Sequence, residues 1–310
     1  MRICLMIEGQ ESVDWENWLG LANACEENEI EALFRSDHYL SVMGRVERGS
    51  LDAWSTISAL AAATTTLRLG TLVSPVTFRH PSVLAKSVVT ADQIAGGGRI
   101  ELGLGAGWHE AEHRAYGFPF PPTGQRLEML EEQIEIISRQ WEEGTLDFDG
   151  RHYRVELLDA LPKPISKPHL IVGGQAKPRG LRLAARWADE YNLVMLSADE
   201  CRAKVPLINE AWKRAKRESP IISLMTPAIV GSDRVDLLER IHRYAEIRGE
   251  DARDPDAYLR QQPPQVLAGT VAEVARRIEE LEDAGVERLM LQYLMHDDLD
   301  GVDLIAELAG

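Results

Sequence analysis

Apolar and polar positions follow two rhythms along this chain, short apolar runs and longer amphipathic segments. The clearest example is Leu67–Gly107, where apolar runs at Leu67–Val76 and Arg99–Leu104 flank an amphipathic segment, Pro81–Ile94. That segment carries apolar residues at helical spacing, and proline is well tolerated in a first helical turn. A strand, a helix and a second strand of these lengths predict a right-handed βαβ unit.

The same unit recurs along the chain. Apolar strands are predicted to begin near residues 2, 31, 67, 99, 168, 190, 221 and 287, with helices between them. Eight alternating units favour an α/β fold of the (β/α)8 or TIM-barrel type over an open, doubly wound sheet. One such barrel accommodates residues 1–310 as a single domain.

The predicted helices share a 3.6-residue apolar repeat. They cover Trp15–Glu27, Leu51–Thr65, Pro81–Ile94, Arg126–Trp141, Leu181–Trp187, Ala198–Lys216, Val235–Arg248, Thr270–Ala284 and Leu299–Leu308. Thr270 and Glu273 form a capping-box pattern at the start of one of these helices.

Two predicted insertions interrupt the rhythm, one after strand four and one before strand five. Trp108–Gly124 is too rich in proline and glycine to form one helix. Gly144–Pro164 contains an Asp149-Gly150 turn between two short runs, which predicts a hairpin. A further proline-rich segment, Asp251–Pro264, is predicted to be a loop.

Composition and charge narrow the possible partners and location. The net charge is −16 and no basic run occurs, which argues against nucleic acid and anionic membranes as partners. The three cysteines (Cys4, Cys25 and Cys201) are odd in number and far apart, as is typical of a reducing compartment. The first residues lack the apolar run of a signal peptide, and no segment approaches the about 20 apolar residues of a membrane span. We therefore expect a cytoplasmic protein.

Asp37 and His38 stand at the end of a predicted strand. In a TIM barrel the carboxyl ends of the strands form the active site. His38 has the chemistry to give or take a proton near neutral pH, and Asp37 to hold the imidazole or a ring nitrogen. The alternative interpretation of Asp37 is a cap for the loop that follows.

Two glycine-rich turns also follow predicted strands. The first, Gly103–Gly107, either lets a backbone approach a ligand closely or forms a simple tight turn. It lacks the third glycine of a dinucleotide fingerprint, because Trp108 stands there. The second, Gly173-Gly174, precedes a predicted helix with Lys177 and Arg179 nearby, and suits either a phosphate or a plain loop.

Residues 109–113 read H-E-x-x-H, the zinc motif of metalloproteases. That motif requires a helix long enough to bring His109 and His113 together. Gly117 and Pro119 stop any helix soon afterwards. A polar loop beside the barrel mouth is therefore favoured, and no metal site is predicted.

Five segments together resemble the bacterial luciferase-like superfamily of flavin and deazaflavin oxidoreductases. They are FRSDHYL (Phe34–Leu40), Leu67–Lys86, Gly96–Pro121, Val172–Asn192 and Gly269–Gln292. The resemblance implies a TIM barrel that holds the cofactor ring in its C-terminal mouth. Phe34–Tyr39 is most similar to the branch that uses the deazaflavin coenzyme F420.

The same resemblance implies specific site residues. His38 and Asp37 would be catalytic, His38 as proton donor or acceptor and Asp37 near the ring. A bulge in strand three, often with a non-proline cis peptide in this family, would fall within Leu72–Ser74. The residues implied to line the cofactor are Asp37, Leu72, Val73, Ser74, Gly105, Ala106, Gly107, Trp108, Gly173, Gly174 and Gln175. His109 stands where the family would lead us to expect a side-chain amide.

We therefore expect an F420-dependent oxidoreductase that moves a hydride between the reduced coenzyme and a small organic substrate. Glu8, Trp108 and Arg79 are predicted to shape the substrate side. The alternatives are an FMN-dependent monooxygenase served by a flavin reductase, a non-catalytic flavin-binding protein, and a zinc hydrolase using His109 and His113. The family also implies a homodimer, and the substrate stays open.

Overall fold

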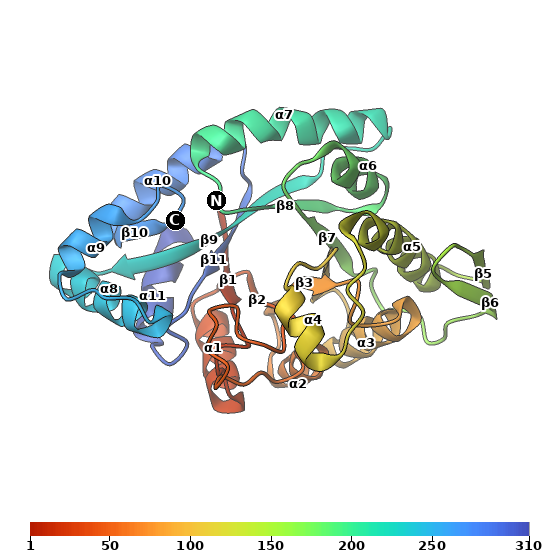
Figure 1. The fold of residues 1–310 in the computed structure, drawn as a ribbon, viewed down its shortest axis with the longest axis horizontal. Helices are drawn as coiled ribbons and strands as arrows, with labels where there is room; N and C mark the ends of the chain where they lie inside the picture. Colours follow the sequence, from red (N-terminus) through yellow and green to blue (C-terminus); the bar gives the residue numbers. More distant parts are fainter. Residues whose placement is uncertain (310) are drawn as a thin grey trace.

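A parallel barrel of eight strands forms the centre of the computed structural model, which describes residues 1–309 (Figure 1). Its strands are β1 (Arg2–Ile7), β2 (Ala32–Arg35), β3 (Arg68–Pro75), β4 (Ile100–Gly105), β7 (His169–Gly173), β8 (Glu190–Val194), β9 (Ile221–Gly231) and β11 (Arg288–Gln292). Neighbouring strands pair in this order around the ring, and the pairing of β11 with β1 closes it. The predicted TIM barrel and all eight predicted strand starts are confirmed.

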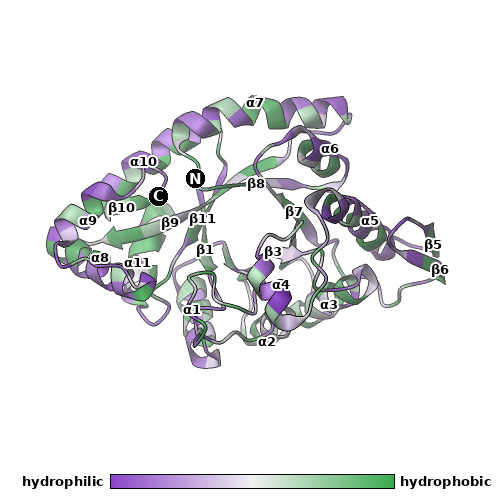
Figure 2. Cartoon of the chain, viewed as in Figure 1, coloured by the Kyte–Doolittle hydropathy of each residue, from purple (hydrophilic) through white to green (hydrophobic). Residues whose placement is uncertain are grey.

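Helices surround the strands (Figure 1). They are α1 (Trp15–Glu27), α2 (Ala53–Ala63), α3 (Pro81–Ala95), α5 (Thr123–Trp141), α6 (Pro178–Trp187), α7 (Ala198–Arg214), α8 (Arg234–Arg248), α10 (Val271–Asp283) and α11 (Asp300–Ala306). Figure 2 shows most of them striped, with apolar and polar residues alternating along each helix, as amphipathic segments require. The predicted capping box of Thr270 and Glu273 is present at the start of α10. Across residues 1–309, every helix is too short or too polar to cross a membrane.

Two predicted loops contain short helices, and one strand was not predicted. Helix α4 (Glu110–Tyr116) lies within Trp108–Gly124 and ends at Gly117, whose φ of 72° terminates it. Helix α9 (Pro255–Gln261) lies within the segment predicted to be a loop, because its proline occupies the first turn and the Asp254 side chain caps it. Strand β10 (Leu267–Thr270) pairs with the C-terminal part of β9, from Ala228 to Gly231.

The predicted hairpin is confirmed as an antiparallel pair, β5 (Leu146–Asp149) and β6 (Arg154–Leu158). It projects beyond α5 at the right of Figure 1. Its turn rests on Glu132 of α5, whose carboxylate accepts hydrogen bonds from the backbone amides of residues 151–153. The insertion before the fifth barrel strand therefore packs outside the barrel.

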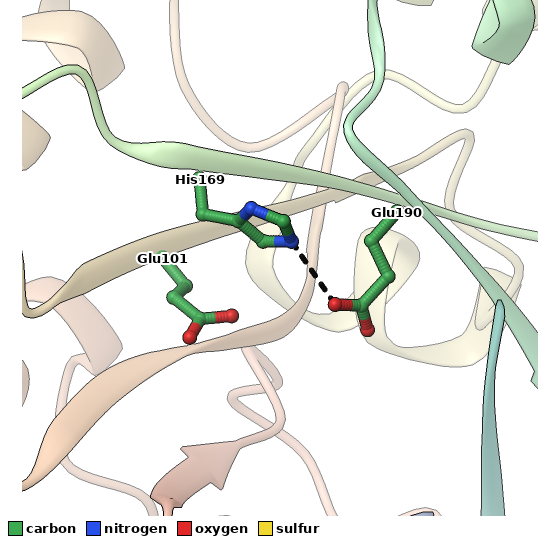
Figure 3. A group of neighbouring side chains, drawn as sticks. All are labelled: Glu101, His169 and Glu190. Atoms are coloured by element: carbon green, nitrogen blue, oxygen red, sulfur yellow. Dashed lines mark hydrogen bonds and ion pairs between the residues drawn. The ribbon is translucent and has the colours of Figure 1, made fainter. Parts of the chain in front are cut away.

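Charged side chains fill the floor of the barrel, at the amino ends of the strands. Glu101, His169 and Glu190 face one another there, with possible ligand atoms within 4.8 Å, as Figure 3 shows. The Arg288 guanidinium already lies between the two carboxylates: Nη1 is 2.7 Å from Oε2 of Glu101 and 2.9 Å from Oε2 of Glu190. Because the Arg288 guanidinium already pairs with both carboxylates, we interpret the group as a buried ion network.

Candidate active site at the barrel mouth

The predicted site residues lie on one side of the barrel mouth. Asp37 and His38 follow β2, Leu72–Ser74 belong to β3, Gly105–Trp108 begin at the end of β4, and Gly173–Gln175 begin at the end of β7. These four strands are consecutive neighbours in the barrel. The fold therefore brings together residues that are up to 138 positions apart in the sequence, from Asp37 to Gln175.

Asp37 is buried and held by two donors. The Ser74 hydroxyl donates to Oδ2 at 2.6 Å, and Nη1 of Arg79 lies 2.5 Å from the same oxygen. Oδ1 is buried and has no hydrogen-bond partner among the described residues. A carboxylate oxygen without a donor leaves room for one more hydrogen bond, such as one from a ligand N–H.

Arg79 bridges two acidic side chains, a contact the sequence did not reveal. Nη2 lies 2.6 Å from Oδ2 of Asp52 and 3.0 Å from the Tyr39 hydroxyl. Burial would lower the pKa of Arg79, but the charges of Asp37, Tyr39 and Asp52 and the hydrogen bond to Asp37 together raise it overall. Its guanidinium thus holds Asp37 in place, and its predicted contact with the substrate stays a prediction.

His38 is hydrogen-bonded to a glutamate from the insertion between β4 and α5. Its Nδ1 lies 2.8 Å from Oε2 of Glu112, and Glu112 is fully buried. Burial would lower the pKa of His38, but the Glu112 hydrogen bond and the charges of Glu112, Glu8 and Asp37 raise it overall. Among residues 1–309, no hydrogen bond is formed by Nε2 of His38.

The bulge in β3 lies where it was predicted. The pairing of β3 with β4 shifts between Thr71 and Ser74, and the peptide bond between Leu72 and Val73 is cis. The Val73 side chain packs toward the glycines of the neighbouring strands. A Cβ atom added at Gly105 would lie 2.7 Å from Cγ2 of Val73, and one at Gly173 would lie 3.4 Å from Cγ1. Gly105 therefore accommodates Val73, whereas a Cβ at Gly173 would make an ordinary contact with it, and the contact of both glycines with a cofactor stays a prediction.

The turn after β4 presents a tryptophan beside His38. Gly107 has a φ of 77°, a conformation that favours glycine, and it turns the chain toward Trp108. The Trp108 side chain is 63% exposed, although its ring centroid lies 5.6 Å from that of His38, edge to face. An exposed indole next to a candidate acid–base group is available to contact a bound molecule.

The turn after β7 has the features of an anion site. A Cβ at Gly174 would lie 2.8 Å from the Tyr191 hydroxyl, so glycine is required there by packing. Gln175 is exposed, and Lys177 precedes helix α6 without a side-chain cap on the helix amides. Uncapped amides at a helix start, with a lysine beside them, suit a phosphate group.

His113 of the H-E-x-x-H segment is engaged in hydrogen bonds, and the absence of a zinc site there stays a prediction. Nδ1 of His113 lies 2.8 Å from the His109 carbonyl oxygen, and Nε2 lies 2.6 Å from the Thr77 hydroxyl. Both ring nitrogens of His113 are thus engaged. Among residues 1–309, the one possible metal-ligand group lies at the barrel floor and includes neither His109 nor His113.

The sequence interpretation missed the role of Glu112 and the surroundings of Glu8. Glu112 was treated as part of a polar loop, although its place after a strand end was a usable indication. Glu8, predicted on the substrate side, is buried and accepts hydrogen bonds from Nε2 of Gln10 (2.7 Å) and Nε2 of Gln292 (2.5 Å).

A cavity of about 480 Å³ lies elsewhere, between α7 and α10. It is lined mainly by Leu196–Ala198, Gln262–Ala268 and Arg277. None of the predicted site residues borders it.

Comparison with known proteins places the chain in a family. The family model described as luciferase-like monooxygenase matches residues 3–288. An uncharacterised protein of Mycobacterium tuberculosis is 30% identical over 200 residues, which is 64% of this chain and 67% of that protein. An FMNH2-dependent dimethylsulfone monooxygenase of Pseudomonas putida is 33% identical over 50% of this chain and 44% of its own. An F420-dependent glucose-6-phosphate dehydrogenase of Intrasporangium calvum is 28% identical over 66% of this chain and 62% of its own.

Solved structures match the fold over nearly the whole chain. An F420-dependent secondary alcohol dehydrogenase has a TM-score of 0.81 at 19% identity, covering 99% of this chain and 97% of its own. An EDTA monooxygenase from Chelativorans has a TM-score of 0.83 at 16% identity, covering 99% and 93%. At these identities the matches establish the fold alone; one is named as an F420-dependent dehydrogenase and the other as a monooxygenase.

Proposed function

Because this chain belongs to the luciferase-like monooxygenase family of oxidoreductases, we propose that it uses coenzyme F420 to move a hydride to or from a small organic substrate. The observation that carries the proposal is the Asp37-His38 pair at the barrel mouth. It combines a buried carboxylate with a free acceptor oxygen and an imidazole whose Nε2 is free. A hydride acceptor such as a carbonyl also requires a proton, and His38 is placed to supply it.

The residues present fit the cofactor in three respects. Oδ1 of Asp37 is a buried acceptor without a donor, as a ring N–H would require. The bulge at Leu72–Val73 lies next to it on β3 and presents apolar side chains to the barrel interior. The uncapped start of α6 beside Lys177 suits a phosphate.

When bound, the reduced deazaflavin would supply the hydride, which is chemistry that no side chain offers. The protein's own part is to bind, to orient and to move the proton. Arg79 and Ser74 hold Asp37 in place, so that its free oxygen is directed consistently. His38 would give its proton in the direction of reduction and take one in the direction of oxidation. Trp108 would cover part of the substrate.

The second candidate is an FMN-dependent monooxygenase that receives reduced flavin from a reductase. Its specific support is the 33% identity to an FMNH2-dependent monooxygenase. Oxygen-dependent turnover distinguishes it, because the F420 reaction runs without oxygen. We also propose that the protein is a cytoplasmic homodimer.

The test is an anaerobic assay of reduced F420 oxidation with a panel of ketones, enones and imines. Histidine 38 is replaced by asparagine, and His152→Asn in the outer hairpin is the matched control. We expect turnover by the wild type and the control, and a loss of about 100-fold or more in His38→Asn, typical of a removed acid–base group. Turnover that needs oxygen and FMN would establish the second candidate instead.

A further inference from the structure

Glu112, at a variable position of the H-E-x-x-H segment, contacts His38 of the candidate active site. It is fully buried and comes from α4, whereas His38 follows β2. Oε2 of Glu112 lies 2.8 Å from Nδ1 of His38. Oε1 accepts hydrogen bonds from the backbone amides of Tyr39 and Leu40, the latter at 3.0 Å. One carboxylate thus holds the imidazole and the two residues that follow it.

The donors around Glu112 keep it ionised. Burial would raise the pKa of Glu112, but the His38 hydrogen bond and charge, together with the amides of Tyr39 and Leu40, lower it overall. An ionised carboxylate only accepts hydrogen bonds. The proton between the two side chains therefore belongs to Nδ1 of His38.

A neutral imidazole carries one ring proton, so a proton on Nδ1 leaves a lone pair on Nε2. We propose that Glu112 is a positioning residue that holds neutral His38 in the Nδ1-protonated tautomer and so makes Nε2 the nitrogen that exchanges protons at the barrel mouth. The use of Nε2 in turnover rests on the function proposed above. The tautomer itself does not depend on any cofactor.

The other groups near His38 do not compete for this role. Glu8, which follows β1, is already paired with two glutamine amides, and Asp37 is paired with Ser74 and Arg79. His109, at the start of α4, approaches the His38 ring edge to face at 5.9 Å, and burial lowers its pKa. Glu112 is therefore the acidic group that contacts Nδ1.

Replacing Glu112 with glutamine tests this geometry without changing the side-chain size. The amides of Tyr39 and Leu40 need an acceptor, so the glutamine oxygen would face them and its NH2 group would face His38. Nδ1 would then have to accept a hydrogen bond, which moves the ring proton to Nε2. Removal of the orienting carboxylate in a catalytic triad has the same consequence for its histidine.

The experiment records ¹⁵N NMR spectra of the histidine rings in cofactor-free protein, at a pH above the titration of His38. The signals of His38 are assigned by their loss in His38→Asn. We expect the Nδ1–H tautomer in the wild type and the Nε2–H tautomer in Glu112→Gln. The control Glu128→Gln removes the carboxylate next to His152, 3.3 Å from its Nε2, and should leave His38 unchanged.

A wild-type His38 in the Nε2–H tautomer would overturn the proposal, and so would a tautomer that Glu112→Gln leaves unchanged. If that variant fails to fold, the wild-type spectrum alone decides. With the loaded enzyme, Glu112→Gln should lower kcat by about 100-fold or more with little change in KM. The expected tautomer without F420 turnover would refute the proposed function and leave the positioning role intact.

Discussion

Replacing Arg288 with methionine should destabilise the barrel far more than the same change at Arg2. Arg288 is fully buried, and its guanidinium contacts the buried carboxylates of Glu101 and Glu190. Arg2 stands directly opposite it on the neighbouring strand, but its pair with Glu31 is largely exposed. The two variants therefore make the same chemical change at adjacent positions that differ in burial.

The magnitude follows from the pKa of Glu101. Burial would raise this pKa, but Arg288, with smaller contributions from Arg68 and His169, lowers it from 4.5 to about 2. A difference of about 2.5 pKa units corresponds to about 3 kcal/mol of folding free energy. Arg68 still contacts Glu101 in the variant, which keeps the expected loss near the low end of the 3–5 kcal/mol typical of a broken buried pair. For the exposed Arg2 pair we expect less than about 1 kcal/mol.

The assay is urea unfolding at pH 7 and again at pH 4. A lowered carboxyl pKa stabilises the fold above the unfolded-state pKa, and this contribution is lost as the pH falls toward the folded-state pKa. The difference in unfolding free energy between the wild type and Arg288→Met should therefore become smaller as the pH falls below about 4.5. A loss in Arg288→Met no larger than that in Arg2→Met would refute the reasoning.

Three further predictions concern the barrel mouth. Gly105→Ala should weaken cofactor binding by about 10-fold, because its Cβ would lie 2.7 Å from Val73, whereas Gly49→Ala meets no atom within 4 Å and should bind normally in the same titration. His38→Asn should lose more unfolding free energy at pH 6 than at pH 9. Because the pKa of His38 is raised in the folded protein, its protonated form stabilises the fold below the unfolded-state pKa, and this contribution is lost as the pH rises through the folded-state pKa. Equal losses at both values would contradict that sign. Dialysed protein should contain no stoichiometric zinc, and a chelator should leave its melting temperature unchanged, because both His113 nitrogens are engaged.

The strand starts were predictable because each barrel strand is a short apolar run between turn residues. Strand β10 was missed because it has four residues, one of them glycine, and it pairs only with the C-terminal part of β9 instead of joining the ring. Helix α9 was missed because proline breaks a helix interior, whereas Pro255 occupies the first turn, where its missing N–H has no cost. Local sequence patterns thus predict the main strands and helices better than they predict short elements such as β10 and α9.

The site was predictable as a set of strand ends but not as a set of contacts. Glu112 and His38 are 74 residues apart, and Arg288 and Glu101 are 187 apart. Only the closed barrel shows which charges become neighbours and which are buried. Gly105 illustrates the difference: the structure shows that its small size accommodates Val73, a contact that the sequence did not reveal, and its contact with a cofactor stays a prediction.

The central claim is the use of coenzyme F420, and the most direct measurement is a pair of binding titrations of cofactor-free protein with F420 and with FMN. The account predicts that F420 binds at least about 10-fold more tightly than FMN, a difference of about 1.4 kcal/mol. It also predicts that Asp37→Asn weakens F420 binding, because Oδ1 of Asp37 is the free acceptor at the mouth. Tighter binding of FMN would contradict the account and point to oxygen chemistry.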